Sequence, residues 1–150
     1  GFHKALTGKQ NLKIMAAAGG IPDSRVDEVL ELVELTEAAN KRTKNYSLGM
    51  KQRLALAGAI LGDPEVLILD EPANGLDPLG IAWLRKFLRS LAGSGRTILV
   101  SSHQLAEMQN TVDDVIIMHK GKLITSGSMK EIIKDGTLEE AFLKLTEGVN

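Results

Sequence analysis

The sequence is most easily bounded by what it lacks. It contains no cysteine, which excludes a disulfide framework and any metal site built from thiolates. No apolar run approaches the roughly 18 residues of a membrane-spanning helix, and no signal peptide opens the chain. The net charge of −1 gives no reason to expect nucleic acid or an acidic partner. What remains is ordinary for a globular domain: 150 residues, 43% hydrophobic and 25% charged, enough for one sizeable core.

The pattern G-x-x-x-x-G-K-[ST], whose backbone N–H groups and lysine cradle nucleotide phosphates, is also missing. Gly8-Lys9 has His3 and Gln10 where the pattern needs glycine and a hydroxyl residue. Gly121-Lys122 fails at the same two places. The sequence therefore contains no loop of this kind.

Acidic side chains follow an unbroken apolar run. Residues 66–69 (VLIL) predict a strand buried on both faces of a parallel sheet, and Asp70 and Glu71 come directly after it. A second apolar run, residues 97–100, predicts another buried strand that leads to Ser101, Ser102 and His103. Open α/β sheets bind their ligands at the carboxyl ends of the strands, so polar groups at both ends favour a ligand site there.

Residues 1–62 are typical of helices. The sequence predicts one helix over residues 8–18, a second that begins at Pro22 and Asp23, and a third capped by Ser47. A helix N-terminus has unpaired N–H groups and the positive end of the helix dipole, so it can receive a phosphate. Gly49 would let the backbone approach such a group closely.

Local signals also predict where other elements begin. Thr7 can cap the helix over residues 8–18, and Asp77 can cap a helix over residues 79–91. Residues 115–118 and 123–125 predict two strands joined by a hairpin turn at residues 119–122. Ser128 with Glu131 and Thr137 with Glu140 each form a capping box, which predicts two short helices.

Four motifs in order identify a resemblance: SLGMKQR from Ser47, LILDEP, NGLDP from Asn74, and a lone histidine, His103, after the second strand. Together they resemble the ATP-binding domain of ABC transporters, particularly the subunits of bacterial exporters. The resemblance implies an α/β, P-loop NTPase-like (RecA-like) core half with an ABC-type α-helical subdomain. Because the phosphate-binding pattern, called Walker A in this family, is missing, the chain resembles an N-terminally truncated member of that family. We therefore expect this chain alone to bind ATP poorly and to hydrolyse it negligibly.

The resemblance also implies residue roles. Asp70 would hold Mg²⁺ through water, Glu71 would act as general base on the attacking water, and His103 would contact the γ-phosphate of ATP and support Glu71. The signature residues would contact ATP held by a second domain; they are Ser47, Leu48, Gly49 and Met50. The D-loop would cross to that domain; it comprises Asn74, Gly75, Leu76 and Asp77.

The signature departs from the common LSGGQ pattern. Ser47 and Gly49 are kept, but Leu48 replaces a glycine and Met50 replaces the glutamine. Contact of Ser47 and the helix N-terminus with phosphate stays compatible with this sequence. Contacts that need glycine at position 48 or an amide at position 50 are not compatible with it.

The resemblance implies three parts: a helical subdomain with the signature helix over residues 1–62, the second half of the ATPase core over 63–127, and C-terminal helices over 128–150. It implies two partners, a membrane-spanning transporter subunit and a second ATPase domain in a head-to-tail dimer. It places the protein in the cytoplasm at the inner face of the cell membrane.

Two other functions remain compatible with the sequence. One is a soluble ABC ATPase that acts on DNA or ribosomes, although residues 1–62 have neither the long coiled coil nor the cysteines of DNA-repair members. The other is a non-catalytic, truncated interaction module, against which the retained Asp70, Glu71 and His103 argue. Transport, with export favoured, is the function that the motifs support best.

Overall fold

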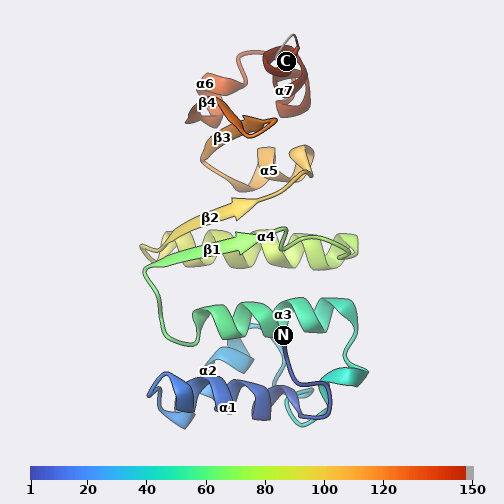
Figure 1. The fold of residues 1–150 in the computed structure, drawn as a ribbon, viewed down its shortest axis with the longest axis vertical. Helices are drawn as coiled ribbons and strands as arrows, with labels where there is room; N and C mark the ends of the chain where they lie inside the picture. The colour runs from blue at the N-terminus through green and yellow to red at the C-terminus, as the bar shows by residue number, and fades with distance from the viewer. Residues whose placement is uncertain (148–150) are drawn as a thin grey trace. The chain divides into compact units, whose positions relative to one another are not determined.

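The computed structural model describes residues 1–147, which form two compact units (Figure 1). The first unit is Gly1–Ser101, and the second begins at Ser102. The division expected from the sequence, at residues 62 and 127, stays a prediction, and its last three residues, 148–150, lie outside the described part. No helix among the described residues is long and apolar enough to cross a membrane.

The first unit opens with helices α1 (Gly8–Ala18), α2 (Asp23–Leu32) and α3 (Leu48–Ile60), with a short 3₁₀ turn, η1 (Thr43–Asn45), before α3. The predicted helix over residues 8–18 is confirmed, and so are the start of α2 at Pro22 and Asp23 and the cap at Ser47. Thr7 caps α1 in a reciprocal arrangement, because its hydroxyl accepts from the Gln10 N–H while the Gln10 side chain accepts from the Thr7 N–H.

The three helices enclose an apolar, fully buried core. Its side chains are at most 1% exposed and come from all three helices and the turn after α2: Leu12, Val26, Val29, Leu30, Val33, Leu54 and Ile60. Tyr46 closes one end of this core. Its hydroxyl donates to the Ala38 carbonyl at 2.7 Å, and burial raises the pKa of the phenol. Its ring lies so close to Gly8 that any side chain at that position would overlap the hydroxyl.

Strand β1 (Val66–Asp70), helix α4 (Pro78–Gly93) and strand β2 (Thr97–Ser101) form a parallel β-α-β unit. The strands pair in register, so that Asp70 lies opposite Ser101 at their carboxyl ends. Helix α4 runs alongside them (Figure 1) and buries Leu84, Leu88 and Leu91. The predicted strands and their parallel pairing are confirmed.

The predicted burial of both strand faces is wrong for the described residues. In β1 only alternate side chains, Leu67 and Leu69, are buried, whereas Val66 and Ile68 are 57% and 74% exposed. In β2, Leu99 is 51% exposed. Successive strand residues point to opposite faces, and within the first unit α4 covers one face of this two-stranded sheet, which accounts for the alternation.

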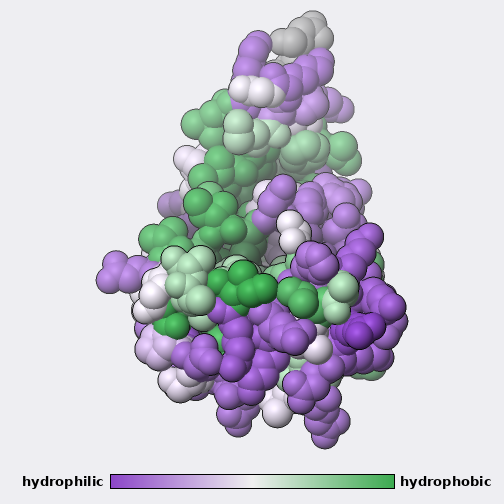
Figure 2. All heavy atoms as spheres, turned by 60° about the horizontal axis from the view of Figure 1, so that its bottom comes forward, coloured by the Kyte–Doolittle hydropathy of each residue, from purple (hydrophilic) through white to green (hydrophobic). Residues whose placement is uncertain are grey.

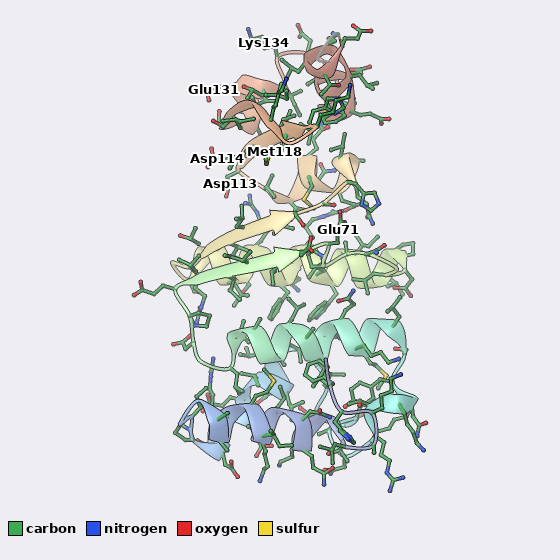
Figure 3. The ribbon with its side chains drawn as sticks, viewed as in Figure 1. Glu71, Asp113, Asp114, Met118, Glu131 and Lys134 are labelled. Atoms are coloured by element: carbon green, nitrogen blue, oxygen red, sulfur yellow. The ribbon has the colours of Figure 1, made fainter. Side chains whose placement is uncertain are left out.

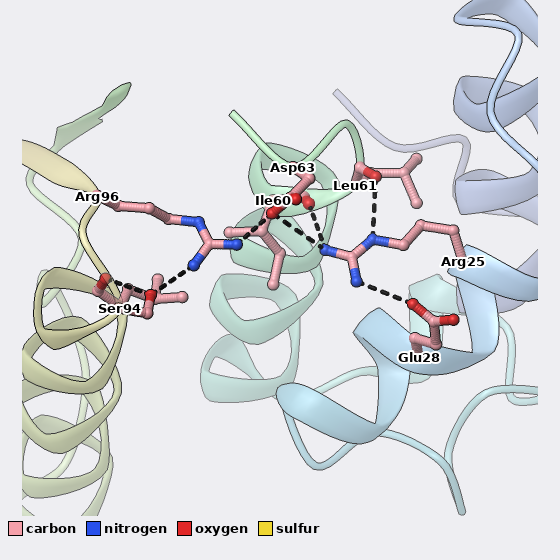
Figure 4. A network of polar contacts seen from close by, with 8 residues as sticks. Arg25, Glu28, Ile60, Leu61, Asp63, Ser94 and Arg96 are labelled. Atoms are coloured by element: carbon pink, nitrogen blue, oxygen red, sulfur yellow. Dashed lines mark hydrogen bonds and ion pairs between the residues drawn. The ribbon is translucent and has the colours of Figure 1, made fainter. Parts of the chain in front are cut away.

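A polar network joins the helical part of the first unit to the strand pair (Figure 4). Arg25 of α2 donates to the carbonyl oxygens of Ile60 and Leu61 at the end of α3, and pairs with Glu28 at 2.9 Å. Asp63 pairs with Arg96, which precedes β2, and lies 3.9 Å from Arg25. These contacts satisfy the carbonyl groups that the end of α3 leaves without helical partners.

The second unit contains α5 (Leu105–Thr111), β3 (Asp114–His119), β4 (Lys122–Ser128), α6 (Met129–Ile132) and α7 (Leu138–Thr146). The strands form the predicted hairpin, although β4 is longer than the expected residues 123–125. The turn places Lys120 and Gly121 at φ values of 48° and 75°, as a tight two-residue hairpin requires. Both predicted capping boxes, Ser128 with Glu131 and Thr137 with Glu140, are confirmed.

The surface around α1 and α2 is mostly hydrophilic (Figure 2). It carries exposed ion pairs, Lys9 with Asp27 at 2.7 Å and Lys13 with Asp23 at 2.8 Å. Exposed pairs of this kind contribute little to stability, so the helical part depends on its core.

Candidate functional site

Asp70, Glu71 and Ser101 meet where β1 and β2 end. The register of the strands sets Asp70 beside Ser101, and the Ser101 hydroxyl donates to Asp70 Oδ1. The Glu71 N–H bonds to the Ser101 carbonyl oxygen at 3.0 Å and to the Ser101 Oγ at 3.2 Å. A single serine of β2 therefore contacts both Asp70, at the end of β1, and Glu71, the residue after it.

Glu71 has an uncommon backbone for a residue with a side chain. Its φ is 48°, in the left-handed region, where a side chain is strained. The two bonds to Ser101 and a further bond from the Asn74 N–H to the Glu71 carbonyl fix this conformation. Here the chain turns sharply out of β1, and the Glu71 side chain stands, half-buried, at the end of the strand (Figure 3).

The edge suits a hard divalent cation. The Asp70 carboxylate is exposed, and its bond to Ser101 uses one of about four acceptor positions that a carboxylate offers. Mg²⁺ prefers oxygen ligands and keeps several waters, so one carboxylate together with substrate phosphates is a usual site for it. No group of three or more acidic or histidine side chains that could hold a metal alone occurs in residues 1–147.

The predicted signature residues form the first turn of α3. The Ser47 hydroxyl accepts from the Met50 N–H at 3.1 Å. Leu48 and Gly49 are the first two residues of α3, so no carbonyl group of the helix lies four residues before them to accept from their N–H groups. The Met50 side chain packs against the core, whereas that of Leu48 is 52% exposed. This turn offers backbone donors and a hydroxyl to an anion, but no side-chain amide at position 50.

The predicted D-loop, residues 74–77, connects the β1 edge to α4. Gly75 has a φ of 73°, which favours glycine. Asp77 caps α4 by accepting from the Gly80 N–H at 2.7 Å, and Pro78 occupies the first helical turn. The cap that the sequence indicates at Asp77 is present.

The structure brings some predicted residues together. Asp70 and Glu71 share the strand edge, and the D-loop lies against the first turns of α3, where the Gln52 side chain donates to the Asn74 carbonyl at 3.4 Å. His103 is exposed and follows β2 by two residues, but it belongs to the second unit. Its approach to Glu71 stays a prediction.

Two contributors were missed by the reading of the sequence. Ser101 was noted only as the end of a strand, and Gln52 only as part of the SLGMKQR string. The signal for Ser101 was its position in the strand. It lies four residues after Thr97, just as Asp70 lies four residues after Val66. No local signal marks Gln52, because its partner lies 22 residues away in the sequence.

The chain is similar in sequence to known ATP-binding proteins of transporters. The sequence model of the ABC transporter family matches residues 2–74, from the segment before α1 to the D-loop. The bacitracin transport ATP-binding protein BcrA of Enterococcus faecalis is 47% identical over 136 residues, which are 89% of this chain and 44% of BcrA. The lantibiotic transport ATP-binding protein SrtF of Streptococcus pyogenes is 39% identical, over 94% of this chain and 60% of SrtF.

This chain belongs to the ABC transporter family of ATP-binding proteins. The solved ATP-binding subunit of an ABC transporter superposes with a TM-score of 0.84 at 28% identity, over 97% of this chain and 65% of that structure. CbiO1 of Clostridium perfringens, part of the cbiONQ transporter complex, gives a TM-score of 0.79 at 30% identity, over 99% and 59%. The predicted family and the P-loop NTPase-like α/β fold are confirmed.

This chain spans less than half the length of the two BcrA proteins that it matches. Its first unit supplies the signature turn, the strand-end carboxylates and the D-loop, all in the order that the family resemblance implied. The activity of the whole protein is therefore a matter for proposal.

Proposed function

We propose that this chain is part of the ATP-hydrolysing subunit of an ABC transporter, which couples ATP binding and hydrolysis to export across a membrane. The observation that carries the proposal is the strand edge at which Ser101 holds Asp70 and the strained Glu71 side by side. Phosphoryl transfer requires mainly positioning and charge neutralisation, and two adjacent carboxylates can divide those tasks.

Each carboxylate has its own task in this proposal. Asp70 would hold Mg²⁺ through water, and the bound ion would neutralise charge on the ATP phosphates. Glu71 accepts a proton from the attacking water, and the left-handed backbone at this residue directs its carboxylate out of the strand. His103 contacts the γ-phosphate and supports Glu71.

The signature turn acts on ATP held by a second ATPase domain in a head-to-tail dimer. The N–H groups of Leu48 and Gly49 and the hydroxyl of Ser47 donate to phosphate oxygens, favoured by the positive end of the α3 dipole. Residues 74–77 reach toward the same second domain. Neither Gly-Lys pair of this sequence fits the pattern of a phosphate-binding loop, so we assign that task to none of these residues.

The relatives support transport over the two alternatives that the sequence left open. BcrA and SrtF are named for bacitracin and lantibiotic transport, and CbiO1 for a transporter complex. By this likeness, the partner is a membrane-spanning subunit, the substrate is a compound of the bacitracin or lantibiotic kind, and the site of action is the cytoplasmic face of the membrane. Nothing in the described residues favours nucleic acid as a partner.

The direct test is Glu71→Gln in the ATPase that contains this chain. The change keeps size and hydrogen bonding but removes the base, so we expect steady-state ATP hydrolysis to fall about 100-fold or more while ATP binding persists. Glu65→Gln is the matched control, because Glu65 is exposed and precedes the other end of the same strand. Equal hydrolysis by the Glu71→Gln and Glu65→Gln proteins would refute the role of Glu71.

A further inference from the structure

The first turns of α3 lie against the D-loop of the same chain. A Cβ atom added to Gly75 would overlap the Leu48 Cδ2, so a Leu48 methyl group already covers the glycine backbone. A Cβ atom on Gly49 would lie 3.8 Å from the Leu76 Cδ2, which is ordinary van der Waals contact. One helical turn further, Gln52 donates to the Asn74 carbonyl at 3.4 Å.

These contacts come from one face of α3. Leu48 and Gln52 are four residues apart, so they lie one above the other on the helix surface. The next residue, Arg53, places its guanidinium 3.9 Å from the centre of the Trp83 ring on α4, and its Nη1 donates to the Val33 carbonyl. The face therefore holds both the D-loop and the helix that follows it.

Gly75 is a glycine for two separate reasons. Its φ of 73° disfavours any side chain, and the Leu48 methyl group occupies the space that a Cβ atom would need. The second reason exists only because residue 48 is a large apolar residue. Leu48 is 52% exposed, so burial of its side chain contributes little to stability. Its contact with the turn at Gly75 is therefore the feature that suggests a role for this side chain.

We propose that Leu48 and Gln52 are positioning residues that fasten the D-loop to the signature turn in the same chain, so that the two segments move as one body. Any displacement of α3 then carries residues 74–76 with it. The consequence for ATP turnover rests on the function proposed above, but the restraint itself is a property of this chain and is testable without nucleotide.

Amide hydrogen exchange of the protein tests the restraint at the D-loop. The Asn74 and Leu76 N–H groups bond to the carbonyl oxygens of Glu71 and Ala73, so they report opening of this turn. We expect Leu48→Ala to accelerate exchange at both amides about fivefold, with α1 amides unchanged. Leu48→Met, which keeps an apolar side chain of similar volume, should restore the slow exchange.

Leu79→Ala is the matched control, because it removes the same atoms from a side chain that is 81% exposed at the start of α4. It should leave exchange at Asn74 and Leu76 unchanged. Wild-type exchange at these amides in Leu48→Ala would overturn the proposal. Uniform acceleration throughout the first unit would also overturn it, since that would show a loss of overall stability.

A double-mutant cycle tests the contact between Leu48 and Gly75. Gly75→Ala should lower the Tm of the wild type by about 6 °C, because it combines the unfavourable φ with the overlap with Leu48. In the Leu48→Ala background only the unfavourable φ remains, so the same change should lower Tm by about 3 °C. Equal shifts in the two backgrounds would show that Leu48 does not restrain Gly75.

Discussion

The helical part of the first unit buries its large apolar side chains, whereas the strand pair leaves several of its own exposed. Leu12 and Leu54, in α1 and α3, are fully buried, whereas Val66, Ile68 and Leu99 of the strands are more than half exposed. Both regions have caps, registers and turns where their sequences indicate them. The difference shows that regular local structure and burial have separate causes.

The comparison also separates stability from chemistry. Helices α1 to α3 bury side chains against one another, in a core that continues into residues of β1 and α4. The strands bury one alternate set of side chains, and their polar ends carry the carboxylates. The region with the less complete packing is therefore the one that presents Asp70 and Glu71.

The largest expected effect that could break this comparison comes from truncating one aliphatic side chain in the helical part and one in the strand pair. Leu54→Ala should lower the free energy of unfolding by about 3 kcal/mol, because it leaves a cavity among fully buried neighbours. Ile68→Ala should cost less than about 0.5 kcal/mol, since that side chain is 74% exposed. Urea unfolding followed by the fluorescence of Trp83, the single tryptophan, measures both values in the first unit.

Comparable losses for the two variants would contradict the comparison, because Ile68 would then be buried in solution. Leu54→Met serves as the control for volume. It keeps an apolar side chain of similar size and should cost under about 1.5 kcal/mol.

A smaller effect sharpens the role of local signals in the helical part. Thr7→Ala should cost about 1 kcal/mol, because it removes the hydroxyl that accepts from the Gln10 N–H at the start of α1. Thr7→Ser, which keeps this acceptor, should be close to the wild type. The same unfolding experiment gives both values, and an equal loss for alanine and serine would show that the cap does not stabilise α1.

The smallest effect concerns the junction between the two regions. The hydrogen bond from Arg96, with the positive charges of Arg96 and Arg25, lowers the pKa of Asp63 in the folded protein. Its stabilisation is therefore complete above the unfolded pKa of about 3.9 and is lost as the pH falls through the lower folded value. Asp63→Asn should flatten the fall of Tm with pH below about pH 4 and should leave its slope near pH 7 unchanged.

A matched variant checks this reading of the junction. Asp23 pairs with Lys13 of α1 on the exposed surface of the helices. If Asp63→Asn and Asp23→Asn changed the acid limb of the curve identically, the depressed pKa of Asp63 would not be specific to the junction.

Much of the fold could be predicted from the sequence because its signals are local. Thr7, Ser47 and Asp77 cap the helices that their positions indicated, and Thr97 to Ser101 pairs with β1 in parallel. The exposure of Ile68 could not be predicted, since an apolar run specifies a strand but not which elements cover its two faces. The extent of β4 was underestimated because Ser126, Gly127 and Ser128 are not typical strand residues.

The candidate site could be predicted only in part for a similar reason. Asp70 and Glu71 stand out because they follow an apolar run, but the function of Ser101 depends on the register between strands that are 31 residues apart. The contact of Leu48 with Gly75 is equally non-local. From the sequence, Leu48 was only a departure from the LSGGQ pattern, whereas in the structure it covers a turn.

The measurement that tests the central claim most directly is the Mg²⁺ dependence of ATP hydrolysis by the ATPase that contains this chain. If Asp70 serves the metal and Glu71 the water, Asp70→Asn should raise the Mg²⁺ concentration for half-maximal hydrolysis about tenfold or more. Glu71→Gln should leave that concentration unchanged while it lowers the maximal rate. An unchanged Mg²⁺ requirement in Asp70→Asn would contradict the assignment of the two carboxylates at the end of β1.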